Sequence, residues 1–587
     1  MKRPQSLASG TAPRTELGAA LASCRGAFIG VGVMSLMINT LYLSGSFFML
    51  EIYDRVLPSR SVPTLVALII LVAGLYVAQG FLDVVRSRIL ARIGSSLDES
   101  LSARVYDTVV RMPLVGGGKG EGLQPLRDLD SIRGFLSSAG PSALFDLPWL
   151  PLYLGICFIF HPLIGLTALG GAIVLIILTV MTEVMTKVPA QRSTGYAMRR
   201  NDLAISSRRN AEVLVAMGMA GRLAQRWSET NRDYLANQQR ASDVAGGLGG
   251  IAKVLRMFLQ SAVLAVGAWL VINQQATAGI IIAGSILSAR ALAPVDLAIA
   301  NWKGFVAARQ GWNRLNKLLA RMPVRDEPTL LESPTQKLSV EGVTVVPPGE
   351  QQRVVAQDIT FALEAGNGLG IIGPSGSGKS SLLRALVGVW QPARGHVRFD
   401  GAAIEQWSPD VLGRHIGYLP QDVELFAGTI AQNIARFVPD ADSAGIIAAA
   451  RDAGVHDLIV RMREGYDTQI GEHGSVLSAG QAQRIALARA LYGNPFLVVL
   501  DEPNSNLDTE GDEALTRAIQ SVRARGGIVI VVAHRPVGIE AVDMVLFLRD
   551  GRTQSFGPKE QVLAQVLQRP AMPAPIKIVS EGGVTKA

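Results

Sequence analysis

The sequence contains few cysteines and few charged side chains for a chain of 587 residues. Its two cysteines, Cys24 and Cys157, lie in or beside apolar runs, so no disulfide framework and no cysteine metal cluster is available. Charged residues make up 18% of the chain and hydrophobic residues 49%. Soluble proteins average about a quarter charged residues. The mean hydropathy of +0.29 is therefore best explained by two unlike parts, one of them apolar.

A concentrated basic block is also missing, although the formal net charge is +8. Arginine and lysine are spread along the whole chain, and positive loops beside a membrane explain the charge at least as well as nucleic-acid binding does. We therefore expect a lipid bilayer, and no nucleic acid, among the partners of this chain.

Four long stretches lack Asp, Glu, Lys and Arg altogether. They are Ala27–Leu50, Ser61–Leu82, Leu147–Thr182 and Met257–Ala289. A helix crosses the hydrocarbon core of a bilayer with about 20 residues. The two longer stretches contain the turn sequences HPLIG and NQQATAG, so each predicts a pair of helices and the total is six spans. Buried helices of a soluble protein do not require uncharged stretches of this length.

The placement of charge predicts the orientation of these spans. Eight Lys and Arg residues lie between positions 83 and 133, and residues 187–256 hold more, whereas residues 51–60 hold only Arg55 and Arg60. Because positive loops stay on the cytoplasmic side, both termini and both long connections are expected there. Apolar residues recur in the connections at three- and four-residue spacing, which predicts helices that continue beyond the bilayer.

Composition divides the chain into five segments. Residues 1–26 are polar and mildly basic, and we expect a cytoplasmic tail that is not a signal peptide and is too short to hold a peptidase domain. The six-helix segment covers residues 27–320, and a proline-rich linker covers 321–336. Short β-branched runs alternate with helical patterns over 337–567, which predicts a nucleotide-binding α/β domain. Residues 568–587 have little to bury and are expected to be disordered.

The segment GPSGSGKSS, residues 373–381, matches the phosphate-binding pattern G-x-x-x-x-G-K-[ST]. It follows the strand-like GLGII and precedes the helical SLLRALVGV, the context in which backbone N–H groups converge on phosphate oxygens. Lys379 is expected to pair with the β- and γ-phosphates of ATP, and the Ser380 hydroxyl to ligate Mg²⁺. The predicted ATP-binding residues here are Gly373, Pro374, Ser375, Gly376, Ser377, Gly378, Lys379, Ser380 and Ser381.

The segment FLVVLDEP supplies the second part of this chemistry. Its apolar residues predict a buried strand whose end presents Asp501 to Mg²⁺ and Glu502 to the attacking water. Phosphoryl transfer requires positioning and charge stabilisation more than covalent chemistry, so these groups suffice for hydrolysis.

A third segment, LSAGQAQRIALARAL, contains LSAGQ at residues 477–481 and resembles the ABC signature, usually LSGGQ. Gln421 in YLPQD matches the Q-loop of that family, Asp508 in SNLD its D-loop, and His534 in VVAHR its switch histidine. With six spans ahead of it, the sequence resembles an ABC exporter over nearly its whole length. That resemblance implies a six-helix all-α transmembrane domain followed by a P-loop α/β nucleotide-binding domain.

Five further segments resemble the ATPases of type I protein secretion, the branch that exports RTX-type proteases and lipases. They are MLEIYDRVLPSRSVPTL, FDLPWLPLYL, GIIGPSGSGKSSL, GRHIGYLPQDVELFAGTIAQNIARF and LDEPNSNLD. The resemblance implies an ATP-driven exporter of unfolded proteins in the inner membrane of a Gram-negative bacterium. It also implies a homodimer, a periplasmic membrane-fusion adaptor, a TolC-like outer-membrane channel and a secreted protein substrate.

The same resemblance assigns roles to individual residues. ATP is expected between the phosphate-binding loop of one subunit and Ser478, Gly480 and Gln481 of the other. Glu472 in GEHG matches a loop that touches the partner's membrane helices, and coupling helices are expected near Arg104–Arg111 and Arg199–Arg209. The implied catalytic residues are Glu502, His534, Gln421 and Lys379. The implied Mg²⁺ ligands are Ser380, Gln421 and Asp501, and Asp508 lies beside the nucleotide.

Two positions depart from the family pattern. Ala479 replaces the third signature residue, usually glycine, and we expect activity to survive because Ser478 and Gly480 remain as donors. Pro347 stands where an aromatic residue normally stacks on adenine. Base–aromatic stacking contributes ~1–3 kcal/mol in single-strand systems, so its loss predicts weaker nucleotide affinity or base selectivity.

Two other functions are compatible with parts of this pattern. An exporter of lipids or small molecules would use the same ATPase, and the sequence does not identify the residues that line its path. A nucleotide-gated channel or regulator would bind ATP without using it as fuel. Such a protein should lack the catalytic pair, yet Glu502 and His534 are both present.

Overall fold

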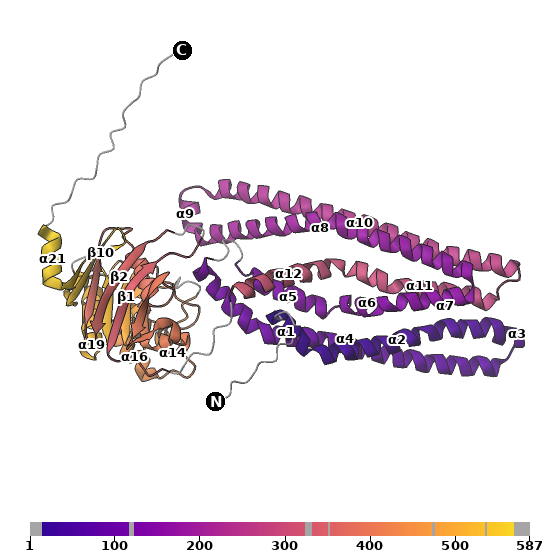
Figure 1. Ribbon diagram of the computed structural model, residues 1–587, viewed down its shortest axis with the longest axis horizontal. Coiled ribbons are helices and arrows are strands. Elements are labelled where there is room, and N and C mark those ends of the chain that lie inside the picture. The colour runs from indigo at the N-terminus through magenta and orange to yellow at the C-terminus, as the bar shows by residue number, and fades with distance from the viewer. Residues whose placement is uncertain are drawn as a thin grey trace, which may run out of the picture. The chain divides into compact units, whose positions relative to one another are not determined.

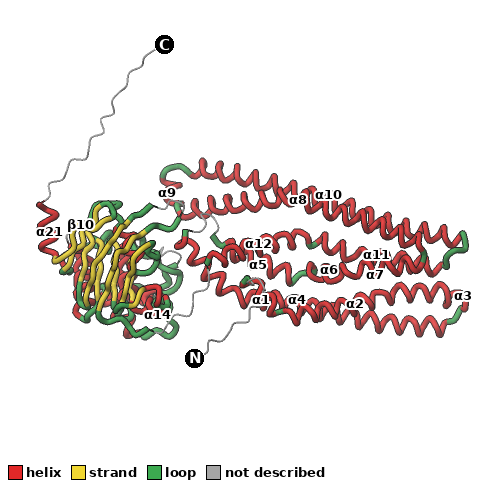
Figure 2. The backbone as a smooth tube through the Cα atoms, in the orientation of Figure 1, coloured by secondary structure: helices red, strands yellow, loops and turns green. Residues whose placement is uncertain are grey.

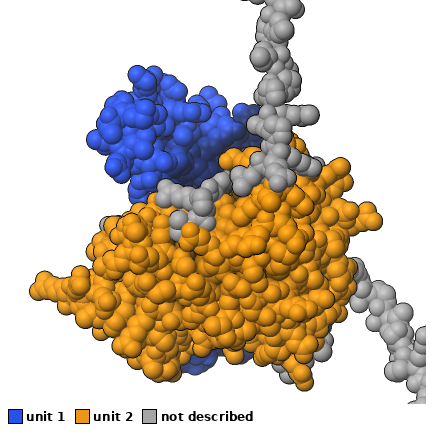
Figure 3. Space-filling model, turned by 90° about the vertical axis from the view of Figure 1, so that its left-hand side faces the viewer, with its two compact units in different colours: residues 1–113, 118–323 blue, residues 114–117, 324–587 orange. Residues whose placement is uncertain are grey.

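The computed structural model describes residues 15–116, 122–322, 331–349, 353–471, 476–533 and 537–568. The chain divides into two compact units, coloured separately in Figure 3. Unit 1 comprises Met1–Pro113 and Gly118–Pro323, and unit 2 comprises Leu114–Gly117 and Val324–Ala587. The main boundary thus lies inside the segment 321–336 that the sequence predicts to be a linker. Predictions for Glu472, His534 and residues 569–587 lie outside the described residues.

The described residues of unit 1 form helices. Across the described part of the chain, six helical segments are long and apolar enough to cross a membrane, which confirms the predicted number of spans. The six segments are Arg25–Ser59, Val62–Val115, Gly140–Phe160, Pro162–Arg209, Ala220–Ile272 and Ala278–Ala300. The elements are α1 (Glu16–Ser23), α2 (Arg25–Glu51), η1 (Ile52–Val56), α3 (Leu57–Ser59), α4 (Val62–Arg111), η2 (Met112–Val115), α5 (Gln124–Leu136), α6 (Gly140–Asp146), η3 (Leu147–Trp149), α7 (Leu150–Phe160), α8 (Pro162–Arg209), α9 (Ala211–Ala216), α10 (Ala220–Ile272), α11 (Ala278–Ala300) and α12 (Trp302–Arg321).

Both predicted hairpins are confirmed. The chain turns at His161, whose Nδ1 accepts a hydrogen bond from the backbone N–H of Leu163 at 3.2 Å and so caps α8. It turns again before Thr277, whose Oγ accepts from the N–H of Ile280 at 3.3 Å and caps α11. A side-chain acceptor at each helix start satisfies a backbone donor that has no partner inside the helix.

Three helices extend far beyond a bilayer, as their spacing predicts. Helices α4, α8 and α10 contain 50, 48 and 53 residues. At 1.5 Å per residue each is roughly 70–80 Å long, against about 30 Å for the hydrocarbon core. Figure 1 shows α8 and α10 side by side along their length. The short helix α9 joins them directly after the predicted coupling segment Arg199–Arg209, and η2 follows Arg104–Arg111.

The described part of the segment 1–26, predicted to be a cytoplasmic tail, is helical. Thr15 caps α1 by accepting from the N–H of Gly18 at 3.2 Å, and α2 begins at Arg25. Leu17 is fully buried in a cluster with Leu97 and other apolar residues of the unit. The segment is polar on average, so its composition did not indicate that Leu17 is buried. Packing of Leu17 in this cluster anchors α1.

A buried polar network joins the first three spans. Arg86 on α4 donates to both carboxylate oxygens of Asp146, at 3.0 and 3.1 Å, where α6 ends. Asn39 on α2 donates to the same carboxylate at 2.8 Å and accepts from the Tyr153 hydroxyl of α7 at 2.9 Å. Arg86 and Asp146 are 7% and 5% exposed. The third span is interrupted here by η3, between Asp146 and Leu150.

A second polar contact joins the opposite end of the first span to the sixth. Asp54, in the π-helical turn η1, accepts from the Thr277 hydroxyl at 2.6 Å and from the N–H of Gly279 at 2.9 Å. A carboxylate at a helix N-terminus is favourable because unpaired N–H groups and the positive end of the helix dipole lie there. A β-carbon at Gly279 would lie 2.7 Å from the Asp54 carboxyl group, so this contact requires glycine.

Unit 2 contains all the described strands, as Figure 2 shows. One sheet has the order β2-β1-β4-β5, and the other has the order β10-β9-β3-β8-β7-β6. The strands are β1 (Lys337–Val345), β2 (Ala356–Glu364), β3 (Gly368–Ile372), β4 (Arg394–Phe399), β5 (Ala402–Ala403), β6 (Ile416–Leu419), β7 (Leu497–Asp501), β8 (Ile528–Val532), β9 (Met544–Arg549) and β10 (Arg552–Pro558). The helices are α13 (Lys379–Leu386), η4 (Ile404–Gln406), α14 (Pro409–His415), α15 (Ile430–Ile434), α16 (Ser443–Asp452), α17 (His456–Val460), η5 (Gly465–Asp467), α18 (Ala479–Leu491), α19 (Thr509–Ala524), α20 (Val537–Glu540) and α21 (Lys559–Gln568).

The six-stranded sheet brings the predicted nucleotide-binding residues to one edge. Strands β9, β3, β8, β7 and β6 are parallel, and every residue of β7 and β8 is buried, as expected for strands covered on both faces. In this register Val532 pairs with both Ile371 and Asp501, and Leu419 pairs with Leu500. Ligands of such sheets bind beyond the carboxyl ends of the strands.

Candidate nucleotide site

The loop from Gly373 to Gly378 connects β3 to α13 and has the backbone that the phosphate-binding pattern predicts. Gly373, Gly376 and Gly378 have φ values of 155°, 77° and 92°. A β-carbon at Gly373 would lie 2.1 Å from the carbonyl oxygen of Leu548, and one at Gly378 would lie 2.2 Å from that of Val355. Glycine is therefore required at these positions by conformation and by close approach of the neighbouring backbone.

Lys379 is the first residue of α13, and its ammonium group is held inside this loop. Nζ donates to the carbonyl oxygens of Gly373 at 2.8 Å and Pro374 at 3.0 Å. Burial lowers the pKa of Lys379, and the carboxylates of Glu502 and Asp501 oppose that shift. The sequence separates these carboxylates from the lysine by more than a hundred residues, and the fold brings all three charges together.

Ser380 and Asp501, the predicted Mg²⁺ ligands, are in direct contact. The Ser380 hydroxyl donates to Asp501 Oδ1 at 3.2 Å. Burial raises the pKa of Asp501, the Ser380 hydrogen bond lowers it, and the neighbouring Glu502 raises it. Asp501 is only 1% exposed, so a cation is the natural counterpart for its charge.

Glu502 follows β7 in a left-handed backbone conformation, with φ of 52°. Its N–H donates to the Val532 carbonyl at 3.1 Å, which ties it to the end of β8. A non-glycine residue in this region costs about 1–3 kcal/mol and persists only where the surroundings hold it. Such strain clusters at functional sites, and here it falls on the predicted catalytic carboxylate.

Gln421 lies two residues past β6, the strand that pairs with β7, and its side chain is exposed. The topology therefore places it at the same sheet edge as Asp501, as the Q-loop assignment requires. No hydrogen bond joins the two side chains among the described residues. Its role as an Mg²⁺ ligand stays a prediction.

The signature residues form the start of α18 and are held by a reciprocal cap. Ser478 Oγ accepts from the N–H of Gln481 at 3.3 Å, and Gln481 Oε1 accepts from the N–H of Ser478 at 3.0 Å. The hydroxyl hydrogen of Ser478 remains available to a phosphate. No hydrogen bond or ion pair among the described residues joins Ser478, Gly480 or Gln481 to the phosphate-binding loop of the same chain.

Positions 479 and 480 of the signature differ in how closely a neighbouring backbone approaches them. Ala479 is exposed at the first turn of α18, whereas a β-carbon at Gly480 would lie 2.9 Å from the carbonyl oxygen of Asn506. Gly480 is therefore a glycine that the packing requires, whereas the activity expected with Ala479 stays a prediction.

Asp508 caps α19 and also holds the signature helix. Its Oδ1 accepts from the N–H of Gly511 at 2.9 Å and from Arg484 of α18. The Gly511 hydrogen bond lowers the pKa of Asp508, partial loss of solvent around this exposed side chain opposes the shift, and the charge of Arg484 lowers the pKa further. No described hydrogen bond joins Asp508 to the phosphate-binding loop of its own chain.

The residues present fit a magnesium nucleotide. The Ser377 hydroxyl is 3% exposed and has no hydrogen-bond partner within the structure, although it lies in a loop built around converging backbone. A phosphate oxygen would satisfy it. No cluster of three or more acidic, histidine or cysteine side chains is found in the described ranges. Mg²⁺ does not need one, because it binds through one or two protein oxygens together with phosphates and water.

Pro347, the residue expected to face adenine, lies just past β1 and is half-buried. The described residues 346–349 offer no aromatic ring there. The weaker nucleotide affinity expected from this exchange stays a prediction.

Sequence reasoning missed three polar residues around the site. Gln483 and Arg484 of α18 are 2% and 5% exposed and bind the loop after β7. Arg384 of α13 lowers the pKa of Asp501 by its charge and stacks on Trp390, with 4.9 Å between guanidinium carbon and ring centre. Polar residues inside apolar helical patterns were the available signal, but only the packing shows what they contact.

Comparison with known proteins agrees with this geometry. The family profile described as ABC transporter transmembrane region matches residues 28–295, and the profile described as ABC transporter matches residues 356–505. A type I secretion system ATP-binding protein of Rhizobium meliloti (strain 1021), PrsD, is 58% identical over 97% of this chain and 98% of its own length. This chain belongs to the type I secretion family of ABC transporters.

Two other similarities extend the picture of this transporter. The toxin RTX-I translocation ATP-binding protein of Actinobacillus pleuropneumoniae is 26% identical over 92% of this chain and 76% of its own. A bacterial Atm1-family ABC exporter with ATP bound matches with a TM-score of 0.76 at 23% identity, covering 93% of this chain and 97% of its own. The transporter therefore has the ABC exporter fold, spans the membrane several times and couples ATP hydrolysis to transport, as predicted.

Proposed function

We propose that two copies of this transporter enclose two ATP molecules and export unfolded proteins in a type I secretion system. The observation that supports this most directly is that Ser478 and Lys379 each make contacts within their own segment, and none is described between them. The signature serine keeps a donor available, yet no described hydrogen bond connects it to its own phosphate-binding loop. A second copy can supply the missing half of each site.

Hydrolysis then follows from the residues at the sheet edge. The loop and Lys379 bind the β- and γ-phosphates, and Ser380 with Asp501 would hold Mg²⁺, which when bound neutralises phosphate charge. Glu502 accepts a proton from the attacking water while the water oxygen bonds to the γ-phosphorus. The bond from that phosphorus to the bridging oxygen breaks, which yields ADP and phosphate. His534 and Gln421 belong to this proposal by their family positions.

Closure of the two nucleotide units around ATP would supply the force for export. The long helices α4, α8 and α10 carry the chain well beyond a bilayer's thickness, and the proposed coupling segments are the last residues of α4 and α8, next to the turns that follow them. Movement at those turns can be transmitted along rigid helices to the membrane spans, and release of phosphate would reset them.

Protein cargo is supported by the relatives, which are named for type I secretion and for RTX toxin translocation. The proposal therefore includes a periplasmic adaptor, an outer-membrane channel and a secreted substrate. It places the transporter in the bacterial inner membrane, with both termini and unit 2 in the cytoplasm, in agreement with the positive charge of its long connections.

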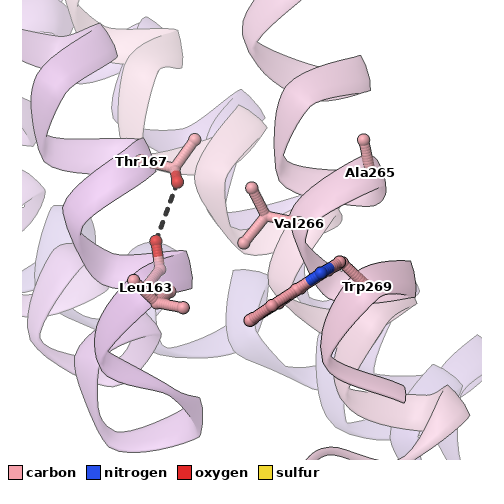
Figure 4. A pocket seen from close by; sticks show the side chains of 5 residues that line it. All are labelled: Leu163, Thr167, Ala265, Val266 and Trp269. Atoms are coloured by element: carbon pink, nitrogen blue, oxygen red, sulfur yellow. Dashed lines mark hydrogen bonds between the residues drawn. The ribbon is translucent and has the colours of Figure 1, made fainter. Parts of the chain in front are cut away.

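One groove described on unit 1 is mainly apolar. A groove of about 340 Å³ between α8 and α10 is lined by Leu163, Thr167, Ala265, Val266 and Trp269 (Figure 4). Its hydroxyl, on Thr167, already donates to the Leu163 carbonyl at 2.7 Å. An apolar groove of this kind suits contact with lipid chains, because its side chains carry only the Thr167 hydroxyl and the Trp269 indole N–H as polar groups.

Mixed dimers test whether each ATP site is shared. Lys379→Ala removes the loop cation and Ser478→Arg blocks the signature, so each variant alone should retain no trapped nucleotide with vanadate. In a mixed dimer both defects fall on the same site if the site is shared, and the other site is intact. Differently tagged variants purified together should therefore trap about one nucleotide per dimer and recover hydrolysis.

Wild type and Glu502→Gln serve as controls for this experiment. Wild type should hydrolyse ATP and Glu502→Gln should bind it with little turnover. Absence of any recovery in purified mixed dimers would place each complete site within one chain. Equal hydrolysis by wild type and Glu502→Gln would remove the proposed catalytic step.

A further inference from the structure

The first two turns of the signature helix hold the loop that carries the catalytic carboxylate. Three residues of α18 contact residues 502–508 of the same chain. Gly480 lies against the carbonyl of Asn506, Gln483 bonds to the backbone on both sides of Asn504, and Arg484 bonds to Asp508. The segment 502–508 is therefore attached to α18 along its whole length.

Gln483 makes the contact nearest to Glu502. Its Nε2 donates to the carbonyl oxygen of Pro503 and lies 3.5 Å from that of Glu502. Its Oε1 accepts from the N–H of Asn506 at 3.1 Å. A side chain that is 2% exposed and uses both ends of its amide on one loop fixes that loop's position relative to the helix.

The loop needs such support because Glu502 is strained. Its φ of 52° lies in the left-handed region, where a residue with a side chain stays only when its neighbours hold it. On one side its N–H is tied to Val532 of β8 at 3.1 Å. On the other side, the Gln483 amide holds the carbonyls that follow Glu502.

We propose that Gln483 is a positioning residue for hydrolysis: from the signature helix it holds Glu502 in the conformation that aims its carboxylate at the attacking water. This inference rests on the proposed function, because it assumes that Glu502 acts on ATP. In the proposed dimer α18 serves the partner's nucleotide while Glu502 serves its own. The amide of Gln483 therefore also connects the two ATP sites through a single rigid segment.

Gln483→Met tests the role, because methionine has a similar volume but cannot hold the Pro503 carbonyl or the Asn506 N–H. A carboxylate displaced by about 1 Å can cost about 10²-fold in rate, so we expect kcat for ATP to fall by about that factor. KM for ATP should stay within about twofold, since Lys379 and its loop are untouched. Gln565→Met is the matched control, because Gln565 of α21 accepts one hydrogen bond from the Ser555 hydroxyl of β10 and takes no part in the contacts between α18 and residues 502–508. Its loss should change neither constant.

The double variant Gln483→Met with Glu502→Gln distinguishes a positioning role of Gln483 from a purely structural one. If Gln483 acts through Glu502, adding Gln483→Met to Glu502→Gln should not lower the residual rate further, because effects of residues that act as one unit are not additive. Should Gln483→Met fail to fold, Gln483→Glu retains the acceptor for the Asn506 N–H and should still show the fall in kcat without a rise in KM.

Three results would overturn the assignment: a kcat within twofold of wild type, a KM that rises as much as kcat falls, or full additivity with Glu502→Gln. The proposed function fails in a different way. If wild type and Glu502→Gln hydrolyse ATP equally, the catalytic role of Glu502 is wrong, whereas an inactive Glu502→Gln beside a fully active Gln483→Met refutes only the role of Gln483.

Discussion

The ionised form of Asp501 is destabilised by the same burial that suits this residue to bind a cation. Its carboxyl group is 1% exposed, and its contact with the Ser380 hydroxyl does not offset burial, so its pKa lies above the ordinary value of 3.8. An acid with a raised pKa in the folded state binds protons more tightly there than in the unfolded chain. The fold therefore loses stability as pH rises from 3.8 through the raised pKa, and the ionised form becomes favourable when a cation binds.

Asp501→Asn should consequently increase the stability of the nucleotide unit at neutral pH while abolishing Mg²⁺-dependent hydrolysis. The thermal unfolding temperature, measured without nucleotide, should be higher than in wild type at pH 7 and equal to it well below pH 3.8. Asp508→Asn is an informative comparison, because the pKa of Asp508 is lowered in the folded state and its loss should have the opposite sign. A variant of Asp501 that unfolds at a lower temperature at pH 7 would contradict this explanation.

At the scale of elements, the network of Arg86, Asp146, Asn39 and Tyr153 joins α2, α4 and the interrupted third span. Charged residues inside membrane segments are costly and usually paired. Arg86 has a second partner in Asp83, at 3.0 Å, on its own helix. The network therefore fixes the register of three spans at the point where α6 gives way to η3.

Removing one partner of this ion pair should be far more harmful than replacing both. Arg86→Met leaves the buried Asp146 charge without a cation, which costs about 3–5 kcal/mol, and the double replacement should recover most of that loss. Asp146→Leu alone should cost less than Arg86→Met, because Arg86 keeps its contact with Asp83. Thermal unfolding of the detergent-solubilised transporter measures all three variants. Arg55→Met is a suitable control, because Arg55 is exposed and its contact with Glu51, at 3.7 Å, should contribute little. Additive losses in the double variant would mean that the two side chains do not act as a pair.

At the scale of the whole molecule, the chain has separate cores. Two apolar clusters lie wholly within unit 2 and three lie wholly within unit 1. Proteins with several cores depart from two-state unfolding, so a ligand that binds one unit should act on that unit's transition. The phosphate-binding loop, Asp501 and α18 all belong to unit 2.

Calorimetry with and without MgATP should therefore separate the two transitions. At a concentration 100 times its dissociation constant, ATP should stabilise unit 2 by about 2.7 kcal/mol, and we expect the transition of unit 1 to move much less. Glu502→Gln is the protein to use, because it does not consume the ligand. Lys379→Ala should abolish the shift, and an equal shift in both transitions would show that the units unfold together.

The sequence alone determined the nucleotide chemistry and the number of spans. Uncharged runs as long as Ala27–Leu50 have one stable environment, and a glycine pattern such as residues 373–378 has one backbone that suits it, so local physics sufficed. Only the tertiary structure decided which polar side chains support these parts. Gln483 and Glu502, or Arg86 and Asp146, are far apart in the sequence, and no periodicity encodes a contact that exists only once helices and strands have packed together.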